Sequence, residues 1–288
     1  MEIFRTIEET RQRTKEARSK GWTIGFVPTM GYLHEGHASL MRKAREECDL
    51  VVASIFVNPL QFGPNEDFER YPRDPERDTA LARKNGVDVL FMPSREEMYP
   101  TPPLTKVTVS GITETLCGAS RPGHFDGVAT VVSKLFHIIQ PDRAYFGMKD
   151  AQQVAVIEQM VRDLNMDIRV VPCPIVRESD GLAISSRNVY LSPEERSQAL
   201  VLYQSLQQWE TWYEQTKGDL RAIKERIEQT IRTAPLADID YVEIQTYPEL
   251  KPAYDLSREQ LAGRQLLVAL AVRFGSTRLI DNRLVSVG

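Results

Sequence analysis

Short apolar runs alternate with longer amphipathic segments over the first 175 residues of the chain. The runs that are rich in Val, Ile and Phe predict strands at residues 23–28, 50–57, 87–92, 143–146 and 168–171. Between them, apolar residues with helical spacing predict helices at residues 37–47, 128–139 and 150–163. Strands that alternate with helices are typical of a parallel sheet wrapped by helices. The pattern therefore predicts an α/β fold with a doubly wound parallel sheet.

Both ends of the chain differ from this pattern. Residues 1–20 mix Glu and Arg throughout, and their apolar positions Ile3, Phe4 and Ile7 predict a short amphipathic helix rather than a secretory signal. After Pro172 and Pro174 the pattern changes to two polar amphipathic helices and two strand-like runs. These elements are predicted at residues 193–215, 220–233, 239–245 and 265–274. We therefore expect two domains, residues 1–175 and a smaller α+β domain at residues 176–288.

Composition narrows the class of protein. Of 288 residues, 42% are hydrophobic and 26% are charged, as in ordinary globular proteins. The net charge of −4 lacks the basic character of a nucleic-acid-binding protein, so we expect no nucleic-acid partner. The longest strongly apolar run, at 266–272, is far shorter than a membrane helix, and we expect a cytoplasmic protein without a membrane partner. Cys48, Cys117 and Cys173 are odd in number and widely spaced, which predicts buried thiols rather than a disulfide framework.

The most informative segment follows the first predicted strand of the sheet. Gly31 and Gly36 have the spacing of a Walker loop, but His37 and Ala38 stand where Lys and Ser or Thr would be required. The segment also lacks the Gly-x-Gly-x-x-Gly turn of a dinucleotide-binding domain. What remains is His34-Glu35-Gly36-His37 at the start of a predicted helix. The free N–H groups of a helix N-terminus favour phosphate, and Gly36 leaves room for a nucleotide. A pair of histidines with this spacing could also simply cap the helix.

Two further segments carry groups suited to phosphate. Lys149 follows another predicted strand, and Ser185, Ser186 and Arg187 follow a predicted turn at Asp180-Gly181. Taken alone, Lys149 is typical of a solvated surface lysine, and a serine-rich segment that ends in Arg is typical of an ordinary loop. Their combination with the histidine pair, in this order, indicates a nucleotide site.

Motifs of one family follow one another along the chain. They are Pro28-Thr29-Met30-Gly31, His34-Glu35-Gly36-His37, residues 55–62, Arg70-Tyr71-Pro72-Arg73, residues 120–125, Ser133-Lys134-Leu135-Phe136, Lys149-Asp150, Gln152-Gln153, Asp180-Gly181-Leu182-Ala183, Ser185-Ser186-Arg187-Asn188 and Arg278-Leu279-Ile280-Asp281-Asn282. With these residues the sequence resembles the pantothenate synthetases, the ATP-dependent pantoate–β-alanine ligases of the His-Ile-Gly-His nucleotidyltransferase superfamily. The resemblance covers essentially the whole chain and implies a Rossmann-like nucleotide-binding domain.

The resemblance implies a reaction in two steps and a role for each matching residue. Pantoate would attack the α-phosphorus of ATP, and β-alanine would then attack the pantoyl adenylate to give pantothenate and AMP. The residues implied to bind ATP are Met30, Gly31, Tyr32, Leu33, His34, Glu35, Gly36, His37, Gly147, Met148, Lys149, Asp150, Val176, Ile184, Ser185, Ser186 and Arg187. Among them His37, His34 and Lys149 are implied to be catalytic. Gln61 and Gln153 are implied to bind pantoate, and Gln61 also to lie near β-alanine. The family commonly has Glu where Met148 stands, which leaves only the backbone of this position as a binding group.

The resemblance also implies Mg²⁺ with the ATP phosphates, without an assigned protein ligand, and a homodimer. Residues 61–75, which contain Gly63, Pro64 and several charges, are either a lid that closes over the adenylate or an ordinary surface loop. Arg121 and His124 either meet the β-alanine carboxylate or have a packing role, and His137 is expected to pack in a helix. The alternative functions are another nucleotidylyltransferase of the same superfamily, an RNA-binding fragment of an aminoacyl-tRNA synthetase, and a noncatalytic binding protein.

Overall fold

The chain forms two compact units. The computed structural model describes residues 1–64, 66 and 68–287. The first unit consists of residues 1–110, 121–148 and 156–174, and the second of residues 111–120, 149–155 and the chain from Ile175 onward. Two short segments that precede residue 175 therefore group with the C-terminal part of the chain.

A six-stranded parallel sheet organises the first unit. Its strands are β1 (Glu2–Phe4), β2 (Ile24–Thr29), β3 (Leu50–Ile55), β4 (Val89–Phe91), β5 (Arg143–Gly147) and β6 (Arg169–Cys173). They lie in the order β1-β4-β3-β2-β5-β6, and every pairing is parallel. Its helices are α1 (Ile7–Ser19), α2 (Glu35–Glu47), α3 (Pro75–Lys84), α4 (Arg95–Met98) and α6 (His124–Ile139), with the 3₁₀ turn η1 (Pro59–Gln61). The order reverses next to β2, which is where open sheets of this kind bind ligands.

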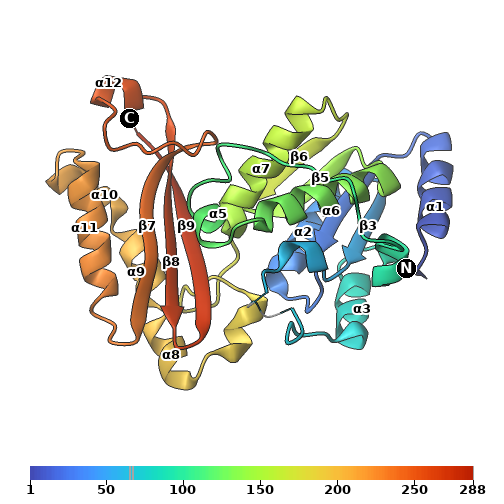
Figure 1. Cartoon of the computed structure of the whole chain (residues 1–288), viewed down its shortest axis with the longest axis horizontal. Coiled ribbons are helices and arrows are strands. Elements are labelled where there is room, and N and C mark those ends of the chain that lie inside the picture. Colours follow the sequence, from blue (N-terminus) through green and yellow to red (C-terminus); the bar gives the residue numbers. More distant parts are fainter. Residues whose placement is uncertain (65, 67, 288) are drawn as a thin grey trace. The chain divides into compact units, whose positions relative to one another are not determined.

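Helices cover both faces of this sheet. Successive strand residues point to opposite faces. On one face Phe26 of β2 packs against Phe136 of α6, with ring centroids 6.3 Å apart. On the other face Val27 and Tyr145 belong to one buried cluster with Met41 of α2. The predicted doubly wound α/β architecture is thus confirmed (Figure 1).

A three-stranded antiparallel sheet organises the second unit, in the order β7-β8-β9. These strands are β7 (Ala237–Tyr247), β8 (Gln265–Phe274) and β9 (Thr277–Ser286). The helices of this unit are α5 (Cys117–Ser120), α8 (Pro193–Gln198), α9 (Val201–Gln207), α10 (Trp209–Gln215), α11 (Leu220–Ile231) and α12 (Arg258–Leu261), with the 3₁₀ turn η3 (Ser186–Tyr190). Helix α11 lies beside β7 (orange in Figure 1), and its Ile223 and Ile227 are fully buried. Helix α7 (Ala151–Asp163) and the 3₁₀ turn η2 (Met148–Asp150) contain residues of both units.

Two predicted elements were wrong in detail. Residues 2–4 form strand β1 instead of helix, and the helix begins only at Ile7, after a capping box made by Thr6 and Glu9. The single helix expected at 193–215 is divided into α8, α9 and α10, because backbone hydrogen bonds of the i to i+3 type occur at Ala199 and Gln208. Within the residues that the structure describes, no helix is both long and apolar enough to span a bilayer.

Candidate active site

The loop at residues 30–37, here called the histidine loop, joins the end of β2 to the start of α2. Gly31 and Tyr32 both have left-handed backbones, with φ of +87° and +48°. A side chain at Gly31 would place its Cβ 2.9 Å from Cγ2 of Ile55, so only glycine fits this turn. Because Tyr32 is strained in this conformation, neighbouring contacts must hold it.

Asp78 of α3 provides such contacts. Its Oδ2 accepts a hydrogen bond from the Tyr32 backbone N–H at 2.8 Å, and its Oδ1 accepts one from Leu33 at 2.6 Å. The residue is only 1% exposed. Burial raises the pKa of Asp78, while the two backbone N–H donors act in the opposite direction. Asp78 could not be predicted from the sequence, because no local pattern links a helix residue to a loop more than forty residues earlier in the chain.

The two histidines of the loop lie together at the beginning of α2. Their ring centroids are 4.1 Å apart, and the backbone N–H of His34 donates to Nδ1 of His37 at 3.3 Å. A neutral His37 in this arrangement carries its proton on Nε2. A Cβ at Gly36 would lie 2.9 Å from Cε1 of His34, so glycine also makes room for the imidazole. The arrangement supplies imidazole groups beside a helix N-terminus, which is suited to phosphate.

Gln61 lies next to the histidine loop within the first unit. Its Nε2 is 3.0 Å from Sδ of Met30, and its Oε1 accepts a hydrogen bond from Nδ2 of Asn58 at 3.2 Å. Asn58 also donates to the carbonyl of Gly127 at 3.0 Å and accepts from the hydroxyl of Tyr99 at 3.0 Å. These partners fix which end of the Gln61 amide faces Met30. The signal for Asn58 was present in the sequence, in the motif at 55–62, but no role was assigned to it.

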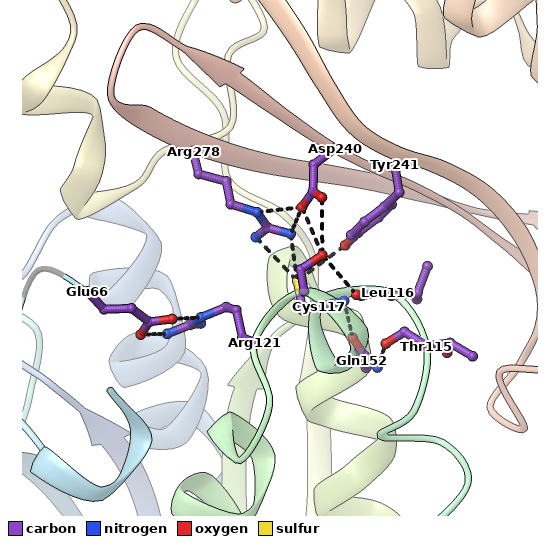
Figure 2. Close-up of polar contacts among 10 residues, drawn as sticks. Glu66, Thr115, Leu116, Cys117, Arg121, Gln152, Asp240, Tyr241 and Arg278 are labelled. Carbon is purple, nitrogen blue, oxygen red and sulfur yellow. Dashed lines mark hydrogen bonds and ion pairs between the residues drawn. The ribbon is translucent and has the colours of Figure 1, made fainter. Parts of the chain in front are cut away.

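Arg121 and His124 contact the segment that follows Gln61. The Arg121 guanidinium forms two hydrogen bonds with the Glu66 carboxylate, at 2.7 and 2.6 Å (Figure 2). Desolvation opposes ionisation of Glu66, but the hydrogen bonds and charge of Arg121 prevail and lower its pKa. His124 Nδ1 lies 2.8 Å from the Gln61 carbonyl. Arg121 also donates to the Gln61 carbonyl at 3.5 Å, so both residues support the backbone at Gln61. Within the predicted lid, residues 61–75, positions 65 and 67 lie outside the part of the chain that the structure describes.

A cavity of about 270 Å³ opens beside the histidine loop in the first unit. Its walls come from the histidine loop, from β3 and the residues after it, and from the start of α3. Lining residues include Met30, Tyr32, Phe56, Phe68, Arg73 and Asp78. The cavity places apolar and aromatic surface next to polar groups, which is the usual character of a small-molecule site.

In the second unit, Lys149 and Ser185 line one small cavity of about 10 Å³ together with Asp281. The backbone N–H of Ile184 donates to the carbonyl of Val176 at 3.0 Å, so these two residues are neighbours as well. Ser185 then begins η3 by accepting a hydrogen bond from the backbone N–H of Arg187 at 3.3 Å. The two predicted phosphate-binding segments of this unit therefore lie side by side.

The predicted site residues fall into two sets, one in each unit. The first unit holds the histidine loop, Gln61, and Gly147 and Met148 at the end of β5. The second unit holds Lys149, Asp150, Gln153, Val176, Ile184, Ser185, Ser186 and Arg187. In the described parts of both units, no group of three or more His, Cys, Asp and Glu side chains is arranged to hold a metal ion.

Other motif residues have structural partners in the second unit. Gln152 accepts a hydrogen bond from the backbone N–H of Cys117 at 3.0 Å, and Arg278 pairs with Asp240 at 2.7 Å (Figure 2). The Cys117 sulfur lies 3.2 Å from the hydroxyl of Tyr241. All three cysteines are free and buried, as predicted.

Comparison with known proteins gives one consistent family. The family model for pantoate-beta-alanine ligase matches residues 2–284. The chain is 58% identical over 282 residues to the pantothenate synthetase of Geobacillus sp. (strain WCH70), covering 98% of each chain. It is 58% identical over 285 residues to that of Pelotomaculum thermopropionicum, covering 99% of each.

Solved structures give the same result for the fold. A crystal structure of pantothenate synthetase from Thermus thermophilus superposes with a TM-score of 0.89 at 49% identity, covering 98% of this chain and 99% of that one. The ligase from Francisella tularensis, described as complexed with beta-gamma ATP and β-alanine, gives a TM-score of 0.79 at 36% identity, covering 99% of this chain and 97% of that one.

Proposed function

Because the chain belongs to the pantoate–β-alanine ligase family, we propose that it condenses pantoate with β-alanine, using ATP, to give pantothenate, AMP and pyrophosphate. The structural observation that carries this proposal is the histidine loop. It places two imidazoles at a helix N-terminus, at the carboxyl end of a central parallel strand.

The reaction has two balanced steps. A carboxylate oxygen of pantoate attacks the α-phosphorus of ATP, a new O–P bond forms, and the bond to pyrophosphate breaks with its electron pair. The amine of β-alanine then attacks the acyl carbon, the C–O bond to AMP breaks, and the amine loses a proton. No covalent bond to the protein is needed in either step.

Negative charge builds on the α-phosphoryl group during the first step. Donors that are already in place stabilise this charge more than they stabilise the ground state. We assign this role to His37, His34 and Lys149 as catalytic residues. The ATP contacts are assigned to residues 30–37, to 147–150, and to Val176 with Ile184–Arg187; the last range and Lys149 belong to the second unit.

Pantoate is small and carries a carboxylate, two hydroxyls and two methyl groups. Neutral amides among apolar neighbours suit such a ligand. We assign its recognition to Gln61 and Gln153, and place the β-alanine near Gln61. The hydrogen bond from Asn58 supports this role for Gln61, because it leaves the NH₂ end of the amide on the side of Met30.

Four further features complete the proposal: the metal, the division into domains, the location and the oligomeric state. Mg²⁺ accompanies the ATP phosphates, where it would neutralise charge on the leaving pyrophosphate; phosphate oxygens and water suit its preference for oxygen ligands. By sequence position, residues 1–175 carry the Rossmann-like part with its ATP and pantoate contacts, although Lys149, Asp150 and Gln153 group with the second unit, and residues 176–288 carry the Ser-Ser-Arg loop. The enzyme acts in the cytoplasm. It is a homodimer, and sedimentation of the purified protein tests this oligomeric state.

A product assay tests the function directly. With ATP, Mg²⁺, pantoate and β-alanine, we expect pantothenate and AMP in equal amounts, and with β-alanine omitted, pyrophosphate release of about one equivalent per site. A stable adenylated product that accumulates beyond one equivalent would instead identify another nucleotidylyltransferase of the superfamily. ATP turnover that does not depend on both pantoate and β-alanine would reject the proposal.

A further inference from the structure

Two adjacent residues of β9 contact the two segments that carry the second unit's proposed phosphate-binding groups. Asp281 is 2% exposed and Asn282 is 6% exposed. They belong to the motif Arg278-Leu279-Ile280-Asp281-Asn282, to which the reaction itself assigns no role. Asn282 contacts Lys149, and Asp281 contacts Arg177 in the segment that precedes Ser185.

Asn282 contacts the lysine segment. Its Nδ2 donates a hydrogen bond to the backbone carbonyl of Lys149 at 2.9 Å. Lys149 lies in η2, a single 3₁₀ turn between β5 and α7, where few regular backbone hydrogen bonds hold the chain. A side-chain amide that bonds this carbonyl therefore helps to determine where the Lys149 side chain begins.

Asp281 contacts the serine segment through Arg177. Its two carboxylate oxygens accept hydrogen bonds from the two terminal nitrogens of Arg177, at 2.7 and 2.8 Å. Such a bidentate pair fixes orientation as well as distance. The guanidinium also donates to the Gly181 carbonyl at 3.1 Å and lies over the ring of Tyr203, 4.5 Å from its centroid.

Arg177 belongs to a tight turn that ends at the serine segment. Residues 176–184 fold back on themselves, with an antiparallel bridge between Arg177 and Ala183. Gly181 has φ of +100°, and a Cβ there would lie 2.0 Å from the Tyr203 ring. The turn is thus held on one side by Tyr203 and on the other by Asp281. Ser185 follows it directly, so the position of the turn sets the position of the serine segment.

We propose that Asp281 and Asn282 are positioning residues of the ligase reaction, which fix Ser185–Arg187 and Lys149 relative to each other within the second unit. Asp281, Lys149 and Ser185 line the same small cavity, as this role requires. The inference rests on the proposed function, because it assumes that Lys149 and the serine segment bind the ATP phosphates.

The test compares Asn282→Ala with Arg283→Gln, its neighbour on β9. Arg283 pairs with Glu210 and donates to the Leu206 carbonyl, away from both segments, so it controls for damage to the strand. We expect Asn282→Ala to slow single-turnover pyrophosphate release by roughly 10- to 100-fold, because small misplacements of catalytic groups have effects of that size. Arg283→Gln should stay within about twofold of wild type, a limit set by the usual neutrality of exposed ion pairs.

A double-mutant cycle separates positioning from simple stabilisation. If Asn282 acts through Lys149, then Asn282→Ala should raise the ATP dissociation constant of the wild-type protein but not that of the Lys149→Ala variant. The melting temperature should fall in both backgrounds. Equal effects on ATP binding in the two backgrounds would overturn the proposal, as would full activity of Asn282→Ala.

Asp281→Asn leaves Arg177 without its carboxylate and could fail to fold, so Arg177→Lys is the second variant. It keeps the charge but loses the two-pronged geometry. We expect folded protein whose ATP affinity falls at least fivefold, and an unchanged ATP affinity would overturn the role of this pair. Failure of the proposed function can be told apart from failure of this positioning proposal, because in the first case the wild-type protein itself would make no pantothenate.

Discussion

Asp78 shows how a single buried residue can determine the shape of a ligand-binding loop. We expect Asp78→Asn to weaken the histidine loop, because an amide has one acceptor oxygen where the carboxylate offers two to Tyr32 and Leu33. Stability should fall by about 1–3 kcal/mol. Single-turnover pyrophosphate release should fall by on the order of tenfold or more, through displacement of the histidines. Chemical denaturation and rapid-quench kinetics measure the two effects.

Glu76→Gln is the matched control for Asp78→Asn. Glu76 lies in the same turn of α3 but is exposed. It should leave both stability and rate close to wild type. If Asp78→Asn loses stability but retains the full single-turnover rate, Asp78 has no influence on the histidines.

Removal of an imidazole tests the chemistry more directly. We expect His37→Ala to lower the rate of adenylate formation by about 100-fold, as for the loss of one preorganised donor to a developing charge. The melting temperature should change little, since the residue lies at the beginning of α2 rather than in the core. An unchanged single-turnover rate in rapid-quench experiments would remove His37 from the catalytic residues.

A site residue could be predicted from the sequence only where a residue type suited to the chemistry stands at a recognisable place in the chain, such as the junction of a strand and a helix. His34, Gly36 and His37 form a compact pattern at a strand-to-helix junction, and the structure brings them together there. Asp78 holds Leu33 through a hydrogen bond between distant parts of the chain, and Asn58 bonds Gly127 and Tyr99 in the same way, so the residues next to them in the sequence do not indicate these partners. Arg121 has an ion-pair partner, Glu66, that spacing alone could not identify.

Among the elements, α6 and η1 make a close contact that carries Gln61. A Cβ at Gly127 would lie 2.2 Å from the Leu60 carbonyl oxygen and 2.6 Å from Cα of Gln61. Gly127→Ala must therefore push η1 away from α6, at a cost of about 1–3 kcal/mol. Because η1 carries Gln61, we also expect the KM for pantoate to rise severalfold, with the affinity for ATP nearly preserved.

Gly63→Ala controls for the glycine-to-alanine change itself. It lies just after η1, and its added Cβ would come no closer than 3.7 Å to the Glu66 side chain. Steady-state kinetics should show a normal KM for pantoate in this variant. A normal KM in Gly127→Ala would mean that the position of η1 does not govern pantoate binding.

Helix α2 is joined to β5 through Glu47, and this contact depends on pH. Glu47 lies 2.9 Å from both Lys43 and Arg143 and accepts from the hydroxyl of Tyr145. The hydrogen bond from Lys43 lowers the pKa of Glu47 from 4.5 to about 2, although desolvation acts in the opposite direction. A carboxyl group with a lowered pKa contributes stability that is complete above about pH 4.5 and is lost as the pH falls toward 2.

We therefore expect Glu47→Gln to lower the melting temperature at pH 7 and to do so less at pH 3. Glu46→Gln is the control, because Glu46 is 68% exposed and lies 3.6 Å from Lys43. It should have a small effect at both pH values. An effect of Glu47→Gln that is the same at pH 7 and pH 3 would contradict the lowered pKa.

Helices and strands were predicted correctly where a continuous run of residues is buried. They were missed where contacts between distant parts of the chain determine the structure. The five predicted strands of the first sheet all form, within two residues at each end. β1 was missed because a three-residue edge strand has no periodicity, and its partner β4 lies more than eighty residues away. Two further elements were not predicted. β9 mixes buried and half-buried positions without a regular alternation, and α3 follows a segment with several prolines that is typical of a loop.

For the whole molecule, the distribution of the proposed nucleotide contacts gives a further prediction. The histidine loop belongs to the first unit, and Ser185–Arg187 belong to the second. If both bind one ATP, the complex with ATP and pantoate should slow hydrogen exchange in peptides that contain either segment, since binding suppresses local opening. Pantoate alone should not protect the serine segment. Protection confined to one of the two segments in the ATP complex would show that the other does not bind the nucleotide, and the catalytic assignment of that unit would have to be withdrawn.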